Sequence, residues 1–335
     1  MSHTGGFGMD TMVSAVACGA ACICLVLTGI VGAAPADDYP NKPVRWIVPT
    51  GPSGGTDFVA RMLAQKVSEA LKQSMVVDNR AGASGMLGME AVARSAPDGY
   101  SLGVISVTPF MSALLTRNVS FDITKDFAPV SLLAASPVIL VVHPSLPVTT
   151  VQGLVALAQA QPGRLNYGSS GTAGITHLAG ELFKRRAGIN LTHIAYKGTG
   201  PAIVDLLAGH VQIGFATPSS IMQHVKAGRL RALAIASEKR SAAAPDVPTF
   251  REAGVPDMLV DIWYGMVAPA NTPAAIIEKL AQSMAAVVKT ADVREKMAAE
   301  GSEPIGNTPA EFRDYLKGET EKWTRLAREI NLRLE

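Results

Sequence analysis

The sequence predicts an α/β protein of two lobes, in which mainly parallel sheets are covered by helices. From Val44 onward, short runs rich in Val and Ile alternate with longer segments whose apolar residues recur at helical spacing. Such alternation is typical of parallel strands joined by helices. Several of the strand-to-helix turns are rich in glycine, and the chain is punctuated by prolines after Val142. A chain that leaves one lobe and later returns to it gives a cleft between two lobes, and ligands of such sheets bind outside the carboxyl ends of the strands.

The expected strands are short and apolar, and each stops at a turn signal such as Pro49 or precedes one of the small polar loops. They are Val44–Val48, Met75–Val77, Ser101–Ser106, Val138–Val142, Leu165–Gly168, Leu191–Ile194, Val211–Phe215, Ala232–Ala236 and Ile262–Ala268.

The expected helices follow these strands and show helical apolar spacing. They are Thr56–Leu71, Met86–Ser95, Val151–Ala160, Gly174–Ala187, Pro201–Ala208, Ser219–Ala227, Pro273–Thr290 and Pro309–Leu332. Thr308 before Pro309, with Glu311 behind it, predicts an N-cap, a first-turn proline and a first-turn acid. Asp98-Gly99 predicts a turn just before a strand.

The domain organisation follows from two expected crossings, one near Ser136–His143 and the other near Trp263–Pro269. We therefore expect a first lobe of residues 37–140 and 263–335, and a second lobe of residues 141–262. Residues 1–36 are expected to be a signal peptide.

The N-terminal segment is predicted to carry an export signal. Residues 11–34 are apolar without a charged residue, and Ala34-Pro35-Ala36 before two aspartates has the pattern of a signal-peptidase site after Ala36. No Lys or Arg precedes the apolar run, which is long for a signal core unless translation starts at Met9 or Met12. An uncleaved anchor or a lipidated cysteine stays an alternative. All three cysteines lie within the first 24 residues, so cleavage leaves a thiol-free protein, which we expect in the periplasm.

Composition and missing motifs exclude several function classes. The net charge is +2 and no basic tract is present, which disfavours nucleic-acid binding. The chain has no Gly-x-Ser-x-Gly elbow, no His-Glu-x-x-His motif and no phosphate-binding loop lysine. We therefore expect no catalytic residue, no metal and no cofactor, and a monomer.

The 52–57 loop, Pro52 to Asp57, has the form of an anion site, because it joins an apolar strand to a helix N-terminus through glycines. The first amides of a helix lack partners within it and lie at the positive end of its dipole, and glycine lets an anion approach them. Asp57 falls in the first helical turn, where it suits the dipole and is able to accept hydrogen bonds from loop amides or from a ligand ammonium. An ordinary glycine-rich turn without a ligand is the alternative.

The 166–172 loop, Asn166 to Thr172, repeats this pattern with small hydroxyls, which offer uncharged donors to a carboxylate. The alternative is an N-cap cluster without a ligand. His177 lies in the first turns of the following helix, a place where a lone histidine is more often structural than catalytic.

Two further turns and one aromatic pair complete the candidates. In the 79–85 loop, Arg80 either pairs with a ligand carboxylate or, as we favour, forms a structural ion pair. The 196–201 turn again places glycines before a helix opened by proline. Trp263-Tyr264 either floors the cleft or packs in the core or hinge.

Eight segments together resemble the extracytoplasmic solute receptors of tripartite tricarboxylate transporters, the Bug receptors. They run in the family's order over nearly the whole chain after the signal segment. The segments are YPNKPVRWIVPTGPSGGTDFVAR (39–61), VVDNRAGASGMLG (76–88), SAPDGYSLG (95–103), YGSSGTAGITHLAGELF (167–183), HIAYKGTGPAIVDLLAGHV (193–211), AGRLRALAIASEKRS (227–241), PDVPTFREAGV (245–255) and WYGMVAPANTP (263–273).

The resemblance implies a two-lobed periplasmic binding protein, type II-like, that closes on a small carboxylated ligand and delivers it to a membrane permease. It implies that loop amides, small hydroxyls and water hold the carboxylate, without an arginine clamp. The ligand-binding residues expected by position, including those at two further strand ends, are Ser53, Gly54, Gly55, Thr56, Asp57, Ala83, Ser84, Ser106, Ser169, Ser170, Thr172, His177 and Thr217.

Two departures from the family pattern refine this expectation. Ser53 stands where glycine is usual, and Ala216-Thr217 stands where many members carry an aspartate able to meet a ligand amine. An amino-acid ligand is thereby disfavoured relative to a plain mono- or dicarboxylate, aliphatic or aromatic.

The sequence leaves two other function classes open. A sensory partner of a membrane signalling protein would use the same closing lobes, and no residue separates it from a transport receptor. A secreted enzyme acting on a carboxylated molecule would need an activated nucleophile or an acid–base pair in the cleft, which the sequence does not show.

Overall fold

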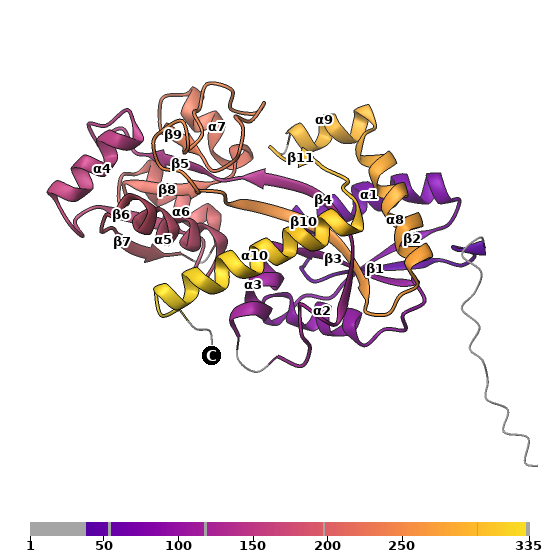
Figure 1. The fold of residues 1–335 in the computed structure, drawn as a ribbon. Coiled ribbons are helices and arrows are strands. Elements are labelled where there is room, and N and C mark those ends of the chain that lie inside the picture. Colours follow the sequence, from indigo (N-terminus) through magenta and orange to yellow (C-terminus); the bar gives the residue numbers. More distant parts are fainter. Residues whose placement is uncertain (1–37, 53–54, 117–118, 197, 300, 333–335) are drawn as a thin grey trace, which may run out of the picture. The chain divides into compact units, whose positions relative to one another are not determined.

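The computed structural model describes residues 38–52, 55–116, 119–196, 198–299 and 301–332, and their strands form two sheets (Figure 1). The first sheet has the order β11-β4-β10-β3-β1-β2. Its strands are β1 (Val44–Val48), β2 (Met75–Asn79), β3 (Ser101–Ser106), β4 (Phe127–Pro137), β10 (Asp261–Pro269) and β11 (Glu303–Pro304).

Helices cover both faces of the first sheet, because its strands are apolar on both faces. Along β1, Trp46 packs in a core with α1 and α8, while its neighbour Ile47 points into a second core that includes residues of α2, α3 and α10. The helices and the short 3-10 turn of this part are α1 (Gly55–Leu71), η2 (Ala83–Gly85), α2 (Met86–Ala93), α3 (Val107–Leu115), α8 (Ala274–Val288), α9 (Ala291–Ala299) and α10 (Pro309–Glu329).

The second sheet has the order β7-β6-β8-β5-β9 and is likewise flanked by helices. Its strands are β5 (Ile139–Val142), β6 (Asn166–Ser169), β7 (Thr192–Ala195), β8 (Ile213–Ala216) and β9 (Arg231–Ile235). Its helices are α4 (Val151–Ala160), α5 (Ile175–Ala187), α6 (Thr199–Leu207) and α7 (Pro218–Lys226). The strands β6, β7 and β8 are parallel, so the loops that follow them begin at one edge of the sheet.

The crossing strands make both sheets mixed, which differs from the mainly parallel sheets predicted. The chain passes from the first sheet to the second at Val138, between β4 and β5, and returns through β10. β10 is antiparallel to β3 and β4, and β5 is antiparallel to β8 and β9. A strand that arrives from the other lobe enters its sheet from the far end and therefore opposes the βα units already there. The lobe limits at residues 140 and 262 stay a prediction.

The last helix, α10, begins with the predicted cap. Thr308 Oγ1 accepts from the Glu311 amide at 3.2 Å, and Glu311 Oε2 accepts from the Thr308 amide at 2.8 Å. Near the other end of the helix, the Arg185 guanidinium of α5 pairs with Glu329 at 3.1 Å. α10 therefore starts on the first sheet and reaches the second lobe.

The predicted signal peptide, residues 1–36, with Cys18, Cys22 and Cys24, lies outside the described residues. Among the helices that are described, none has the length and apolar character required to cross a membrane.

Candidate functional site

The loop after β1 is held by a buried carboxylate. Asp57 is 3% exposed and accepts two hydrogen bonds of 3.0 Å from Arg61 Nε and one of 2.8 Å from Asn79 Nδ2. Asn79 Nδ2 also donates to the Thr50 carbonyl at 3.0 Å. Asp57 thus ties α1 to the end of β2 and, through Asn79, to the chain just before the 52–57 loop. Ser53 and Gly54 lie outside the described residues, and Thr56 is buried beside Asp57.

The 79–85 loop has a strained backbone at the two residues expected to bind ligand. Ala83 and Ser84 have φ angles of 45° and 54°, a left-handed conformation that non-glycine residues adopt at a cost of about 1–2 kcal/mol each. Gly85, at φ 92°, allows close contact, since a side chain there would come within 2.7 Å of Pro109 Cβ. Arg80 pairs with Asp78 at 2.9 Å, so the structural ion pair that we favoured for Arg80 is confirmed.

Ser106 ends β3 and is the N-cap residue of α3, although its side chain makes no capping hydrogen bond. It is 4% exposed and stands opposite Tyr264 of β10 in the antiparallel ladder. Residues opposite each other in such a ladder share one face of the sheet. Ser106 and Tyr264 therefore lie on the same face.

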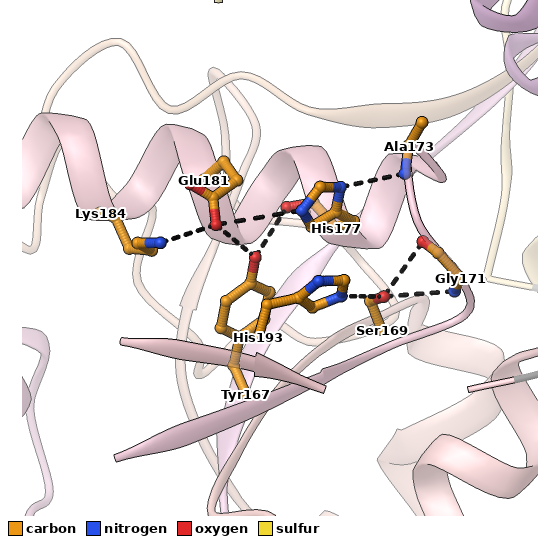
Figure 2. A network of polar contacts seen from close by, with 8 residues as sticks. All are labelled: Tyr167, Ser169, Gly171, Ala173, His177, Glu181, Lys184 and His193. Carbon is orange, nitrogen blue, oxygen red and sulfur yellow. Dashed lines mark hydrogen bonds and ion pairs between the residues drawn. The ribbon is translucent and has the colours of Figure 1, made fainter. Parts of the chain in front are cut away.

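Two stacked histidines lie beside the end of the 166–172 loop (Figure 2). The rings of His177 and His193 lie 4.0 Å apart between centroids. Ser169 Oγ lies 2.6 Å from His193 Nε2 and 3.1 Å from the Gly171 carbonyl, and it has one hydrogen to donate to either of them. His177 Nδ1 accepts from the Ala173 amide at 3.0 Å. Both imidazoles thus serve the loop as hydrogen-bonding supports.

Several amides and hydroxyls of this loop form hydrogen bonds with each other or with α5. The Ser170 amide donates to Thr176 Oγ1 at 2.9 Å, and the Gly171 amide donates to Ser169 Oγ at 3.2 Å. Ser169 is 1% exposed, whereas Thr172 is exposed. The loop is therefore rigid, with Thr172 as its accessible hydroxyl.

Burial lowers the pKa of His177 to about 4 from its ordinary 6.5, with smaller contributions of the same sign from His193 and Lys184 and an opposing one from Glu181. Between these values the unfolded chain binds a proton that native His177 does not, so stability present above pH 6.5 is lost as the pH falls toward 4. Because of His177, the free energy of unfolding is expected to fall by about 2 kcal/mol when the pH is lowered from about 7.5 to about 5.

We expect His177→Asn to flatten this dependence, because asparagine keeps an acceptor for Ala173 but does not titrate. Urea unfolding at about pH 7.5 and about pH 5 measures the pH dependence of stability. His210→Gln, which changes an exposed histidine, is the control. Burial raises the pKa of Asp261 to about 7, which acts in the opposite direction, so each variant is compared with the wild type. Equal pH dependence of His177→Asn and the wild type would contradict the assignment.

Thr217 ends the turn after β8 and is the N-cap residue of α7, followed by Pro218 in the first turn. Its hydroxyl lies 3.2 Å from Ser219 Oγ and 3.1 Å from Ser220 Oγ. The N-terminus of α7 therefore presents a group of three neighbouring hydroxyls.

One cavity is lined from both lobes and includes predicted site residues. It measures about 310 Å³ and is bounded by Gly55 of α1, Tyr264 of β10 and Thr217 and Ser219 of α7. The remaining lining residues are Phe58, Val59, Ser136, Ile262, Met297 and Ser302, so no charged side chain faces it. A side chain at Gly55 would collide with the Tyr264 hydroxyl, so a larger residue there would require the tyrosine side chain to move.

The cavity brings together some of the predicted residues and adds others. Gly55 and Thr217 line it, and Ser169 and Ser170 line a separate narrow recess beside α6. The other described residues of the predicted site line neither, namely Thr56, Asp57, Ala83, Ser84, Ser106, Thr172 and His177. The two aromatic residues differ from each other. Tyr264 lines the cavity, as the first interpretation of the pair expects, whereas Trp263 is fully buried in the core, as the second expects. Ser136, Ser219 and Ser302 were missed, although Ser219 carries the same signal as Thr217: a small hydroxyl where a strand turns into a helix.

Residues 59–332 match the sequence profile described as "Tripartite tricarboxylate transporter family receptor". The chain belongs to this family. It is similar to Protein BugT of Bordetella pertussis, with 36% identity over 315 residues, which cover 93% of this chain and 97% of BugT. The resemblance seen in the sequence is thereby confirmed.

Solved structures of receptors agree with the fold. "R. palustris Rpa4515 with adipate" is 34% identical with a TM-score of 0.73, over 87% of this chain and 98% of that one. MatC from Rhodopseudomonas palustris with bound malate is 29% identical with a TM-score of 0.69, over 86% of this chain and 99% of that one. The two-lobed α/β binding-protein fold is confirmed, and the family consists of periplasmic solute-binding receptors rather than enzymes.

Proposed function

We propose that this receptor binds a small mono- or dicarboxylate, aliphatic or aromatic, between its lobes and delivers it to a tripartite tricarboxylate-type membrane transporter. The observation that carries the proposal is the cavity lined by both lobes, where hydroxyls and the N-termini of α1 and α7 meet and no charged side chain is present. Helix N-termini and hydroxyl donors suit an anion. Contacts to both lobes favour the closed arrangement, because a ligand shifts an equilibrium by its differential affinity.

The ligand carboxylate also reaches the loops that carry the remaining predicted residues. In this proposal the 52–57, 79–85 and 166–172 loops supply amides and hydroxyls, including those of Ser84 and Thr172. Ala216-Thr217 at the end of β8 offers no carboxylate to a ligand ammonium. The ligand is therefore a plain acid, as adipate and malate are in the two related structures.

Export and partners follow from the same proposal. The chain is cleaved near Ala36, acts in the periplasm as a monomer, and meets the membrane subunits of its transporter there. The relatives that carry the same fold are periplasmic proteins.

A thermal-shift screen of the purified protein against mono-, di- and tricarboxylates tests the binding function. A ligand at about 100 times its dissociation constant stabilises the native state by about 2.7 kcal/mol, which raises the melting temperature measurably. The amide of each active acid, with every carboxyl group converted, serves as the control and is expected to give no shift. A flat response across the whole panel contradicts the proposal, and tight binding of aspartate or glutamate without binding of simple acids contradicts the argument from Ala216-Thr217.

A further inference from the structure

A second cavity, of about 380 Å³, lies between α10 and the face of the first sheet at β3, β10 and β4, and shares no lining residue with the cavity between the lobes. Its walls are mostly apolar, with Phe110 of α3 and Phe127 of β4 opposite Leu316 of α10. Phe110 and Phe127 are 1% and 8% exposed, so the floor of the cavity is core, while Leu316 is half-buried at its side. A volume of this size and an apolar lining with a few polar groups are typical of small-molecule sites.

The mouth of this cavity carries charges on one side. Arg313 and Lys317, one helical turn apart on α10, line it together with Glu321. Within the described ranges, neither Arg313 nor Lys317 takes part in a hydrogen bond or an ion pair. Like charges at this spacing repel each other by a few tenths of a kcal/mol. An anion placed between the two side chains would attract both of them and offset this repulsion.

Charges near the opposite wall are already paired. The Asp122 carboxylate binds Lys125 at 2.8 Å and the Thr124 hydroxyl at 2.6 Å, so Lys125 is not a free cation. Glu321, at the far end of the rim, leaves the mouth with two positive charges and one negative charge. The complementary molecule therefore has one carboxylate and an apolar body.

We propose that this cavity is a second binding site, which takes a monocarboxylate with a medium-length alkyl or aryl-alkyl tail. The tail occupies the space between Phe110, Phe127 and Leu316, and the carboxylate lies between Arg313 and Lys317. Arg313 is suited to a two-point contact with carboxylate oxygens.

Octanoate is the probe, and methyl NMR of the purified protein is the measurement. We expect saturable shifts of the Ile123 and Leu316 methyl signals, because both residues line the cavity. The double variant Arg313→Gln with Lys317→Gln is expected to bind octanoate about tenfold more weakly, equivalent to about 1.4 kcal/mol. Octan-1-ol, with the same tail and no charge, should bind both proteins equally, and Arg328→Gln, on the same helix outside the cavity, should match the wild type.

Two further variants keep the result interpretable. Leu316→Trp fills the cavity and should remove the octanoate response. Ser219→Asp, which lies in the cavity between the lobes, should leave it intact, so the outcome is independent of the proposed transport function. Unmoved Ile123 and Leu316 methyls at millimolar octanoate, or equal affinity in the double rim variant, would overturn the proposal.

Discussion

Ser219→Asp is expected to weaken carboxylate binding by about ten- to a hundredfold and to leave the fold intact. Ser219 lines the cavity between the lobes and lies in the first turn of α7, just after Pro218. An aspartate in a first helical turn suits the helix dipole, so α7 should be no less stable. Ser219 is exposed, and the same carboxylate would repel the ligand's carboxylate by about 1–3 kcal/mol at a separation of about 6 Å near the protein surface.

The matched control is Ser219→Asn, which has nearly the same size as aspartate and no charge. Calorimetric titration with the strongest acid from the thermal-shift screen should give nearly wild-type affinity for the asparagine variant and a large loss for the aspartate variant. Equal affinities in the two variants would show that the ligand carboxylate does not lie near the N-terminus of α7.

Glu319→Ala is expected to lower the free energy of unfolding by about 3 kcal/mol, the largest effect on stability that we predict. Glu319 is 5% exposed, and its Oε2 accepts from Trp263 Nε1 at 3.0 Å and from Trp323 Nε1 at 2.9 Å. It also pairs with Lys322. The alanine leaves two buried indole N–H groups without their acceptor and removes the carboxylate beside Lys322, which keeps its hydrogen bond to the Leu259 carbonyl; such a change costs several kcal/mol.

Urea denaturation at about pH 8 measures this cost, because Asp261 is then ionised on both sides of the transition. The pKa of Asp261, about 7, is raised mainly by burial, is held down by Lys322 and is raised further by Glu319 and Glu303, so removing Glu319 also relieves repulsion on the ionised Asp261 and the loss measured at pH 8 is a lower bound. Glu321→Ala, two residues further along α10 and exposed, should change stability by no more than about 0.5 kcal/mol. A loss at Glu319 as small as that at Glu321 would show that the indoles find other partners.

The elements with strong local patterns could be predicted from the sequence. The strand Val44–Val48 and the helix Val151–Ala160 have the predicted bounds, and the Thr308–Glu311 cap is present as expected. These segments were predictable because apolar periodicity and capping act over a few neighbouring residues.

Other elements depend on distant parts of the chain and were missed. β4 (Phe127–Pro137) contains prolines and small residues that argue against a strand, yet it pairs along its length with β10. Ser136 and Ser302 reach the cavity only because the turn before β11 packs against α7, where a side chain at Gly301 would come within 2.9 Å of the Ser219 amide. No local pattern encodes such a contact.

The roles of the two histidines beside the 166–172 loop could not be predicted from the sequence. His177 was expected to bind the ligand. In the structure its ring lies beside the loop, and its Nδ1 accepts a hydrogen bond from the Ala173 amide. His193 was not considered, since its role arises from the pairing of β6 with β7, which sets it opposite Tyr167. Whether His177 also contacts the ligand stays a prediction.

A crystal structure with the strongest acid from the screen tests the central claim most directly. We expect the ligand between the two lobes, with its carboxylate oxygens accepting from amides and hydroxyls of the 52–57 and 166–172 loops and with Thr217 or Ser219 in contact. A carboxylate held between the lobes by an arginine or lysine side chain, or an acid that occupies no site between the lobes, would contradict the claim.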